Sequence, residues 1–265
     1  MALPDYAMRQ PSFPEMYERL LVQPLFRPFA DTVLDRVNLT SGDRVLDIAC
    51  GTGIVARLAR ERMGGGTVVG VDLSPQMLAV ARAVAPEIDW REGSAQALPV
   101  ADSERFDLVL CHQGLQFFAD QPAALREIKR VLAPGGRVAV ATWCSVENSP
   151  VLGELQRVAE RHLGPIVDQR YNFGGAADLE ALLVAAGFRN VRVETETRTV
   201  RFPEGKSFVR MNTMAFVGMS AAKALDETAR AAVVDAIAMA SMEAVSPHLR
   251  NDELVFDLST NLATA

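Results

Sequence analysis

The chain has 265 residues, and its 27 Lys and Arg against 33 Asp and Glu give a formal net charge of −6 at pH 7. Hydrophobic residues make up 49% and charged residues 23%, a balance typical of globular proteins that excludes a disordered chain. The negative charge disfavours duplex nucleic acid as a partner. No apolar run is long enough to span a bilayer, and the first residues lack the basic and apolar regions of a signal peptide. We therefore expect a cytoplasmic protein with no membrane or nucleic-acid partner, and its oligomeric state stays open.

The N-terminal segment is predicted to be helical in two pieces. Residues 12–37 show a helical pattern around Tyr17 and again from Phe29. Pro24 and Pro28 are expected to break this pattern because proline lacks the backbone N–H that a helix needs. These pieces form a predicted N-terminal helical cap over residues 1–40.

Residues 44–143 alternate between short apolar runs and helical stretches. Helix stops are predicted at the glycines 64–66 and at 134–136, and helix starts at Ser74 and Asp120. The apolar runs are rich in Val and Leu and predict buried parallel strands at 44–50, 67–72, 106–111 and 137–143. This alternation predicts a doubly wound α/β sheet.

The C-terminal part predicts two strands with helices between them. Helices near 149–163 and 176–186 precede a strand at 191–202, and residues 254–262 alternate like a further strand. The Met- and Ala-rich segment 205–245 between these strands has a helical pattern. It therefore predicts a helical lid inserted into the last hairpin of the sheet.

A glycine-rich turn after the first predicted strand holds the first chemical signal. Gly51 and Gly53 stand where the chain enters the next helix, so a ligand can approach the backbone and the helix N-terminus. Asp72 ends the next strand, 72 − 53 = 19 residues after the last glycine, where a carboxylate can accept hydrogen bonds from ribose hydroxyls. This spacing is compatible with the dinucleotide fingerprint.

Asp47 favours a different cofactor that contains a nucleoside. It ends the first predicted strand, four residues before Gly51, where a carboxylate would repel a pyrophosphate and pair with a cation. S-adenosylmethionine carries a sulfonium and an ammonium group and no phosphate. It therefore fits this position better than NAD.

Four motifs together resemble the class I S-adenosylmethionine-dependent methyltransferases, in the small-molecule branch similar to the ubiquinone and menaquinone biosynthesis enzymes. They are D-x-x-x-G-T-G at 47–53, the acidic strand end Asp72, G-x-A-x-x-L-P at 93–99 and R-V-L-x-P-G-G at 130–136. The resemblance covers residues 40–145 strongly and the remainder more loosely. It implies a Rossmann-like sheet of seven strands with an antiparallel last strand. Residues 41–203 and 250–265 form the core of a single domain, and 204–249 form the lid.

The resemblance also implies which residues contact S-adenosylmethionine. They are Asp47, Ala49, Gly51, Thr52 and Gly53 for the amino-acid part, Asp72 for the ribose, Leu73, Met77, Ser94 and Ala95 for the adenine, and Cys111, His112, Gln113 and the covering Tyr17 at the methyl-donor end. Two positions depart from the family pattern. Ala49 replaces the usual first glycine, and Ser94 replaces an Asp that accepts from the adenine amino group, so that contact is weaker or supplied by water.

His112 is the candidate catalytic residue because it directly follows the fourth strand. Two roles stay open: a general base with a pKa near neutrality, or a polar wall that hydrogen-bonds the cofactor or the acceptor. A metal cluster of His112 with Cys50, Cys111 and Cys144 is not expected, because small buried thiols are far commoner than metal ligands.

Residues further along the chain have less specific signals. Tyr171, Asp168 and Glu147 could reach the pocket, whereas His162 and His248 are expected in surface or capping roles. A stripe of apolar side chains fits either a core or the underside of a lid: Phe202, Phe208, Met211, Met214, Phe216 and Met219.

The sequence thus predicts methyl transfer from S-adenosylmethionine to the O, N or C atom of a small, apolar or aromatic metabolite. Two alternatives remain: a protein that binds S-adenosylmethionine without transferring the methyl group, and an NAD-linked oxidoreductase. Methylation of DNA or RNA bases is disfavoured because Cys111-His-Gln-Gly follows the fourth strand in place of an Asn/Asp-Pro-Pro-Tyr/Phe loop.

Overall fold

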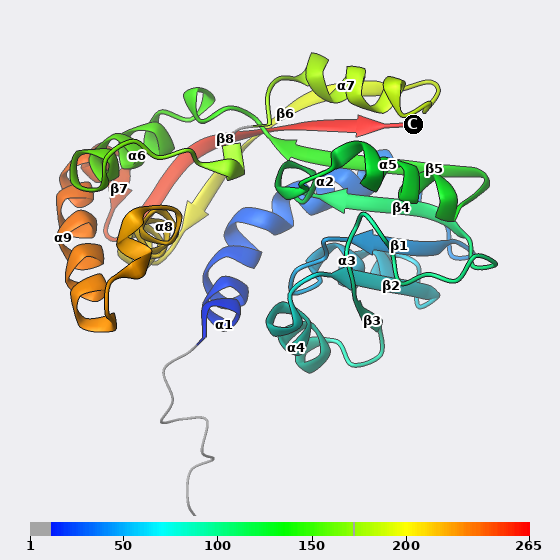
Figure 1. Ribbon diagram of the computed structural model, residues 1–265, viewed down its shortest axis with the longest axis horizontal. Coiled ribbons are helices and arrows are strands. Elements are labelled where there is room, and N and C mark those ends of the chain that lie inside the picture. The colour runs from blue at the N-terminus through cyan, green and yellow to red at the C-terminus, as the bar shows by residue number, and fades with distance from the viewer. Residues whose placement is uncertain (1–11, 172) are drawn as a thin grey trace, which may run out of the picture.

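The computed structural model describes residues 12–171 and 173–265, which form one mixed sheet flanked by helices (Figure 1). The strand order is β3-β2-β1-β4-β5-β8-β6, and β7 pairs with β8. Strands β1 to β5 pair in parallel, whereas β8 is antiparallel to both β5 and β6. The strands are β1 (Arg44–Ile48), β2 (Thr67–Asp72), β3 (Asp89–Glu92), β4 (Phe106–His112), β5 (Leu132–Trp143), β6 (Arg192–Phe202), β7 (Leu249–Arg250) and β8 (Glu253–Thr264). The predicted Rossmann-like sheet with an antiparallel last strand is confirmed, and the two-residue β7 is a small addition to it.

Helices cover both faces of this sheet. They are α1 (Phe13–Tyr17), the π-helix η2 (Glu18–Phe26), α2 (Arg27–Arg36), α3 (Ile54–Arg62), α4 (Pro75–Val84), α5 (Gln121–Val131), α6 (Pro150–Leu163), α7 (Ala176–Ala185), α8 (Gly205–Met219) and α9 (Glu227–Val245), with short 3₁₀ turns that include η3 (Leu115–Phe117) and η5 (Gln169–Tyr171). Adjacent residues of β1 point to opposite faces: Val45 packs with α2, α3 and α4, and Leu46 packs with α5 and α7. Burial on both faces explains the continuous apolar runs in the sequence.

A third cluster of buried side chains lies beside the main sheet. Helices α6, α8 and α9 pack there against the ends of β6 and β8 (Figure 1). Phe202, Phe208 and Phe256 form its aromatic centre, with 4.0 Å between the ring centroids of Phe202 and Phe208. The helices predicted between the last two long strands are thus present, and their action as a lid remains a prediction.

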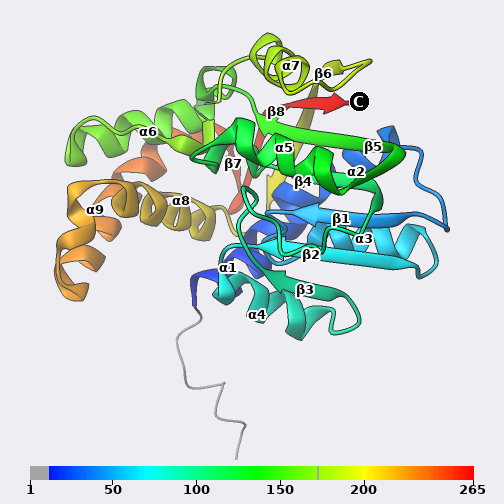
Figure 2. The same cartoon turned by 45° about the vertical axis from the view of Figure 1, so that its right-hand side comes forward.

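The N-terminal helices differ from the prediction. Residues 13–36 form one uninterrupted helical segment, and Pro24 lies inside the π-helix η2 rather than at a break. Pro28 lies in the first turn of α2, where a missing N–H is tolerated. The segment α1–η2 contacts both α4 and α8, as Figure 2 shows. It therefore bridges the main sheet and the third cluster.

The loop after α5 also differs slightly from the prediction. Helix α5 ends at Val131, and the Pro-Gly-Gly stretch that was predicted to close it lies within the irregular start of β5. The pairing of β4 with β5 shifts register there, between Phe106 and Leu108, and Gly135 has a φ of 77°. Glycine supplies this left-handed conformation without steric cost.

No helix in the described part of the chain is long and apolar enough to cross a bilayer.

Candidate active site

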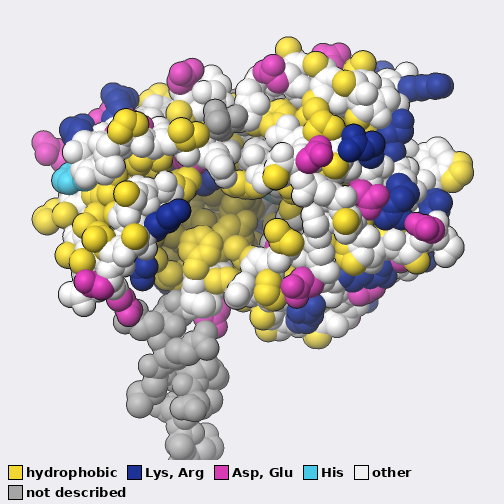
Figure 3. Space-filling view, in the orientation of Figure 1, with side chains coloured by type: hydrophobic (Ala, Val, Ile, Leu, Met, Phe, Trp, Pro, Cys, Tyr) yellow, Lys and Arg dark blue, Asp and Glu magenta, His cyan; other side chains and the backbone are white. Residues whose placement is uncertain are grey.

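A cavity of about 970 Å³ lies where the parallel strands β1, β2 and β4 end. Figure 3 shows it as a hollow lined with hydrophobic side chains. Its walls come from α1–η2, from the turns after these strands, and from α8. The predicted site residues that line it are Tyr17, Asp47, Ala49, Gly51, Asp72, Leu73, Met77, Ser94, Ala95, His112 and Gln113. The size is within the roughly 300–1,000 Å³ typical of small-molecule sites.

Three predicted residues do not line the cavity. Cys111 is 1% exposed and packs into the cluster on the far face of the sheet. Thr52 is buried in the turn, and Gly53 is the N-cap residue before α3 with a φ of 89°. A Cβ atom on Gly53 would lie 2.2 Å from the Trp90 ring. Gly53 is therefore required for close packing against the Trp90 ring of β3, and its contact with the cofactor stays a prediction.

Ala49 adopts a conformation that usually favours glycine. Its φ is 55°, and the turn continues through Gly51 with a φ of 57°. The Ala49 methyl group faces Gly114 so closely that a Cβ atom on Gly114 would lie 2.6 Å from it. The absent side chain at Gly114 thus makes room for the alanine that replaces the usual glycine at position 49.

Asp47 is a buried acid at the end of β1. It is 1% exposed, and its Oδ2 accepts a hydrogen bond from the backbone N–H of Ala56 at 3.0 Å. Burial raises the pKa of the Asp47 carboxyl to about 8, and the negative charge of Asp72 adds to the rise, although the Ala56 hydrogen bond opposes it. No Lys or Arg of the described chain forms an ion pair with Asp47.

Asp72, at the end of β2, organises the neighbouring backbone. Its Oδ2 accepts from the Gly51 N–H and its Oδ1 from the Ser74 N–H, each at 2.8 Å. Ser74 in turn caps α4 by accepting from the Met77 N–H at 3.3 Å. A carboxylate has about four lone-pair sites, so both oxygens of Asp72 can still accept from a ligand.

Tyr17 lies above the glycine turn. Its hydroxyl lies 3.9 Å from the position that a Cβ atom on Gly51 would take. Burial, together with the charges of Asp72, Glu18 and Asp47, raises the pKa of the Tyr17 hydroxyl, which therefore remains a neutral donor. Glu18 pairs with Arg57 of α3 at 2.8 Å and so ties this roof to the helix behind the turn.

The side of the cavity next to α4 carries an apolar edge and few polar groups. Leu73 is 71% exposed and lines the cavity with Met77 and Ala95. The Ser94 hydroxyl accepts from the Gln96 N–H at 3.2 Å. Gln96 also lines the cavity. It was not predicted, because no motif position marks it.

His112 ends β4 and Gln113 follows it, and both line the cavity. His112 is 8% exposed, and its Nε2 has no hydrogen-bond partner in the described chain. Burial lowers the pKa of the imidazole to about 3, so the ring is neutral at physiological pH. Gln113 has a φ of 59° and donates from its Nε2 to the Thr260 hydroxyl at 2.9 Å, while its Oε1 is left without a described partner.

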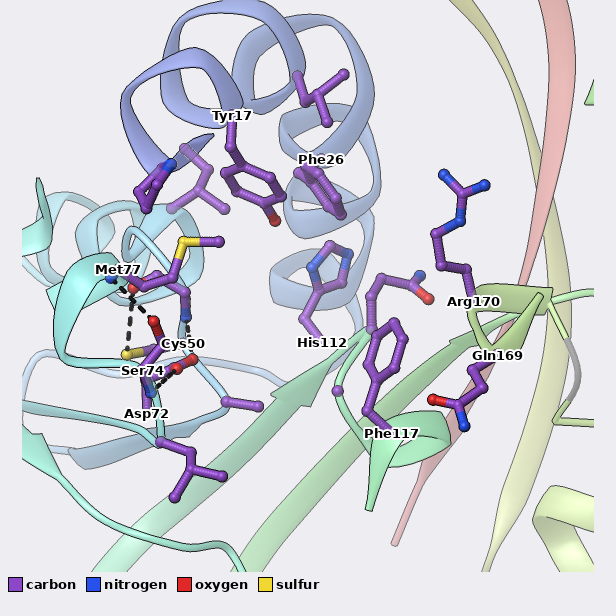
Figure 4. Close-up of a pocket in the computed structure, with 18 of the residues that line it drawn as sticks. Tyr17, Phe26, Cys50, Asp72, Ser74, Met77, His112, Phe117, Gln169 and Arg170 are labelled. Atoms are coloured by element: carbon purple, nitrogen blue, oxygen red, sulfur yellow. Dashed lines mark hydrogen bonds between the residues drawn. The ribbon is translucent and has the colours of Figure 1, made fainter. Parts of the chain in front are cut away.

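Figure 4 shows how the labelled residues divide the cavity. Asp72, Ser74 and Met77 lie on one side, and Gln169 and Arg170 lie on the opposite side. The second half of the cavity was largely missed from the sequence, because it is built from segments far apart in the chain. Its further lining includes Phe26, Phe117, Phe118, Trp143, Gln169, Arg170 and Asn212.

The apolar stripe near α8 is divided between buried core and cavity lining, and its place under a lid stays a prediction. Phe202 and Phe216 belong to the buried third cluster and do not line the cavity. Met211 and Met219 do line it, and Phe208 belongs to both. Tyr171 also reaches the cavity, whereas Asp168 and Glu147 do not line it. No group of three or more metal-ligating side chains is present in the described residues.

A doubly wound sheet with two acids at the ends of adjacent strands and a glycine turn between them defines a Rossmann-like enzyme that binds a nucleoside-containing cofactor. Residues 46–140 match the family described as a methyltransferase domain. A 2-phytyl-1,4-naphtoquinone methyltransferase of Thermosynechococcus vestitus is 33% identical over 198 residues, which cover 67% of this chain and 87% of that protein. A demethylmenaquinone methyltransferase of Thermus thermophilus is 37% identical over 173 residues, covering 58% of this chain and 77% of that protein.

The YcgJ protein of Bacillus subtilis has the same fold, with a TM-score of 0.57 at 20% identity, covering 89% of this chain and 96% of that one. The chain belongs to the class I S-adenosylmethionine-dependent methyltransferases, and it is of the ubiquinone and menaquinone biosynthesis type. Its cofactor is S-adenosylmethionine, so the NAD-linked alternative is wrong.

The residues around the glycine turn fit this cofactor. Asp47 and Asp72 face the cavity, and neither has a Lys or Arg partner in the described chain. The Asp72 carboxylate suits the ribose hydroxyls of S-adenosylmethionine, and a cationic group of this cofactor near Asp47 would favour the ionised form of its carboxyl. The exposed Leu73 side chain offers an apolar surface for a flat base.

Proposed function

We propose that this enzyme methylates a small, apolar, quinone-like aromatic ring. The observation that supports this proposal best is the lining of the second half of the cavity by Phe26, Phe117, Trp143, Phe208 and Met211. Aromatic and Met side chains favour a flat apolar ligand and can adapt to its outline. The two relatives, a 2-phytyl-1,4-naphtoquinone methyltransferase and a demethylmenaquinone methyltransferase, are named for quinone-type substrates, which agree with such a ring.

The cofactor would be held by the residues of the first half. Asp72 accepts from the ribose, Leu73 and Met77 flank the adenine, and Asp47 and Gly51 lie at the amino-acid part. When bound, S-adenosylmethionine supplies an electrophilic methyl group. Tyr17 and Phe26, whose ring centroids are 4.9 Å apart, cover the cavity and exclude water from it.

His112 acts in this proposal by positioning rather than by removing a proton. A group with a pKa of about 3 is a weak base at neutral pH. The unpartnered Nε2 of His112 and Oε1 of Gln113 are better suited to orient an acceptor hydroxyl. Correct alignment of donor and acceptor can supply much of the rate enhancement for a transfer of this kind.

The test is release of S-adenosylhomocysteine by the purified protein with a panel of acceptors. The panel contains reduced naphthoquinones with and without an isoprenoid tail, simple catechols, and phosphoethanolamine as a polar amine. We expect turnover with the aromatic acceptors and none with phosphoethanolamine. Asp72→Asn is the matched control, since it weakens cofactor binding and leaves the apolar walls unchanged. Turnover with the amine alone would refute the proposed acceptor class, and cofactor binding without turnover of any acceptor would favour the non-transferring alternative.

A further inference from the structure

A compact polar group interrupts the apolar half of the cavity on the side away from Asp72. Arg170 lines the cavity from η5, and Asn212 lines it from α8. Arg170 Nη1 donates to Asn212 Oδ1 at 2.8 Å. Arg170 also makes a forked contact with Asp168, with distances of 2.8 Å from Nε and 2.6 Å from Nη2. Three residues from two distant segments thus form one hydrogen-bonded unit.

The charge of Arg170 is already neutralised. Asp168 is buried, and its two oxygens accept from the Arg170 guanidinium and from the Arg170 backbone N–H. The guanidinium carbon also lies 5.4 Å from the ring centroid of Tyr171 and 5.2 Å from that of Phe216. Among the described lining residues Arg170 is the sole Lys or Arg. The unit is therefore poorly suited to bind a free anion.

What remains unpaired on this unit is hydrogen-bond donors. Asn212 is 6% exposed, and its Nδ2 has no partner in the described chain. The amide orientation is fixed, because the Arg170 donor requires the oxygen end of the side chain. A guanidinium has five N–H donors, and Arg170 uses three of them on Asp168 and Asn212. A buried unpartnered donor is costly, so a ligand oxygen that accepts from it is favoured.

The geometry points to Asn212 and Arg170 as a specificity site that recognises a neutral accepting oxygen, a carbonyl or ether, on the aromatic acceptor. This inference rests on the proposed function and narrows it, because a bare hydrocarbon ring and a carboxylated ring both fit the site less well. Gln169 and Arg170 lie across the cavity from Asp72 (Figure 4). The recognised oxygen is thus on the part of the acceptor that is away from the cofactor half.

The test compares three probes on protein saturated with S-adenosylhomocysteine, by isothermal titration calorimetry. 1-Tetralone carries one carbonyl, tetralin is the same bicycle without oxygen, and 1-naphthoate is an anion of similar size. We expect the wild-type protein to bind 1-tetralone about tenfold tighter than tetralin, as one or two hydrogen bonds permit. 1-Naphthoate should bind no tighter than tetralin.

Asn212→Ala should bring the tetralone-to-tetralin ratio close to one while tetralin and S-adenosylhomocysteine affinities stay within about twofold. Asn212→Asp keeps an oxygen for Arg170 and replaces the free donor by an acceptor, so it should lose the ratio even if the alanine variant folds poorly. Ser241→Ala is the matched control, since this hydroxyl is also buried and unpartnered but lies in α9 away from the cavity. It should leave the ratio unchanged.

A wild-type ratio near one, a ratio that survives both Asn212 substitutions, or tightest binding of 1-naphthoate would each overturn the inference. Failure of the proposed function would be seen in a different experiment, the turnover assay, as absence of S-adenosylhomocysteine release with the acceptor panel. The binding ratio is measured without turnover, so the two failures are distinguishable.

Discussion

Replacing Asp47 by asparagine should make the cofactor-free protein more stable, by an amount that grows with pH. Asp47 is buried, faces the charge of Asp72 and has no cationic partner in the described chain. Its folded-state pKa of about 8 lies far above the ordinary value of 3.8. The folded protein therefore holds a proton that the unfolded chain has released. Stability from this group is fully present below pH 3.8 and is lost as the pH rises through about 8.

The magnitude follows from the separation of the two pKa values. At about 1.36 kcal/mol per pH unit, the span from 3.8 to about 8 corresponds to about 5 to 6 kcal/mol. The asparagine side chain has nearly the same shape as that of Asp47, can accept from the Ala56 N–H through its amide oxygen, and does not ionise. The stability difference between the Asp47→Asn variant and the wild type should thus increase by about 1.4 kcal/mol per pH unit from pH 5 to 8 and level off above.

The assay is urea unfolding of both proteins at pH 5, 6, 7, 8 and 9. Other titrating groups cancel in the difference, since they are common to both proteins. Asp43→Asn is the control, because Asp43 is also buried and yet hydrogen bonds from Thr40 and the Arg137 guanidinium hold its pKa below the ordinary value against burial. That variant should be destabilised by an amount that is constant above pH 5. A constant difference for Asp47→Asn as well would refute the assignment of Asp47 as a buried, uncompensated acid.

Three further predictions concern the site. Asp72→Asn should weaken S-adenosylhomocysteine binding by roughly 1.5–3 kcal/mol in calorimetry. It should also lower the melting temperature, because Asp72 accepts from the Gly51 and Ser74 N–H groups. An affinity that is unchanged within twofold would contradict the ribose role. His112→Asn should retain most of kcat. The rate of the wild-type enzyme should not rise between pH 6 and 7, since the imidazole pKa is about 3. A rise there that the variant lacks would show that His112 acts as a general base. Hydrogen exchange in residues 205–219 should slow when S-adenosylhomocysteine binds, if α8 closes on the cavity; an unchanged, slow rate in the free protein would make α8 static core.

The cofactor half of the site was predictable because its signals are local. Asp47, Gly51 and Asp72 lie within one β-α-β unit. Its two strands pair in parallel, so their carboxyl ends lie at the same edge of the sheet. The acceptor half was predictable only in part, at Tyr171 and in the α8 stripe that contains Phe208 and Met211. Arg170 and Asn212 are 42 residues apart in the chain, and no periodic pattern links η5 to α8.

The positions of some residues were predicted correctly, but their burial determined their pKa and whether they reach the cavity. His112 follows the fourth strand as expected, but a pKa near neutrality would require solvent that its 8% exposure excludes. Cys111 and His112 are neighbours on β4 whose side chains face opposite sides of the sheet. Strand alternation therefore allows only one of the two to reach the cavity, and the motif alone does not say which.

Tyr17 was predicted to cover the methyl-donor end, and the π-helix explains why Phe26 beside it was missed. Tyr17 and Phe26 are nine residues apart, which is about 2.5 turns at about 3.6 residues per turn and would place them on opposite faces of an α-helix. With hydrogen bonds to the fifth residue, a π-helix has about 4.4 residues per turn, so the same nine residues make about two full turns. Both side chains then share one face, and their ring centroids are 4.9 Å apart. Phe26 also lies 6.2 Å from the His112 ring, so the wider helix joins the cover of the cofactor half to the cover of the acceptor half.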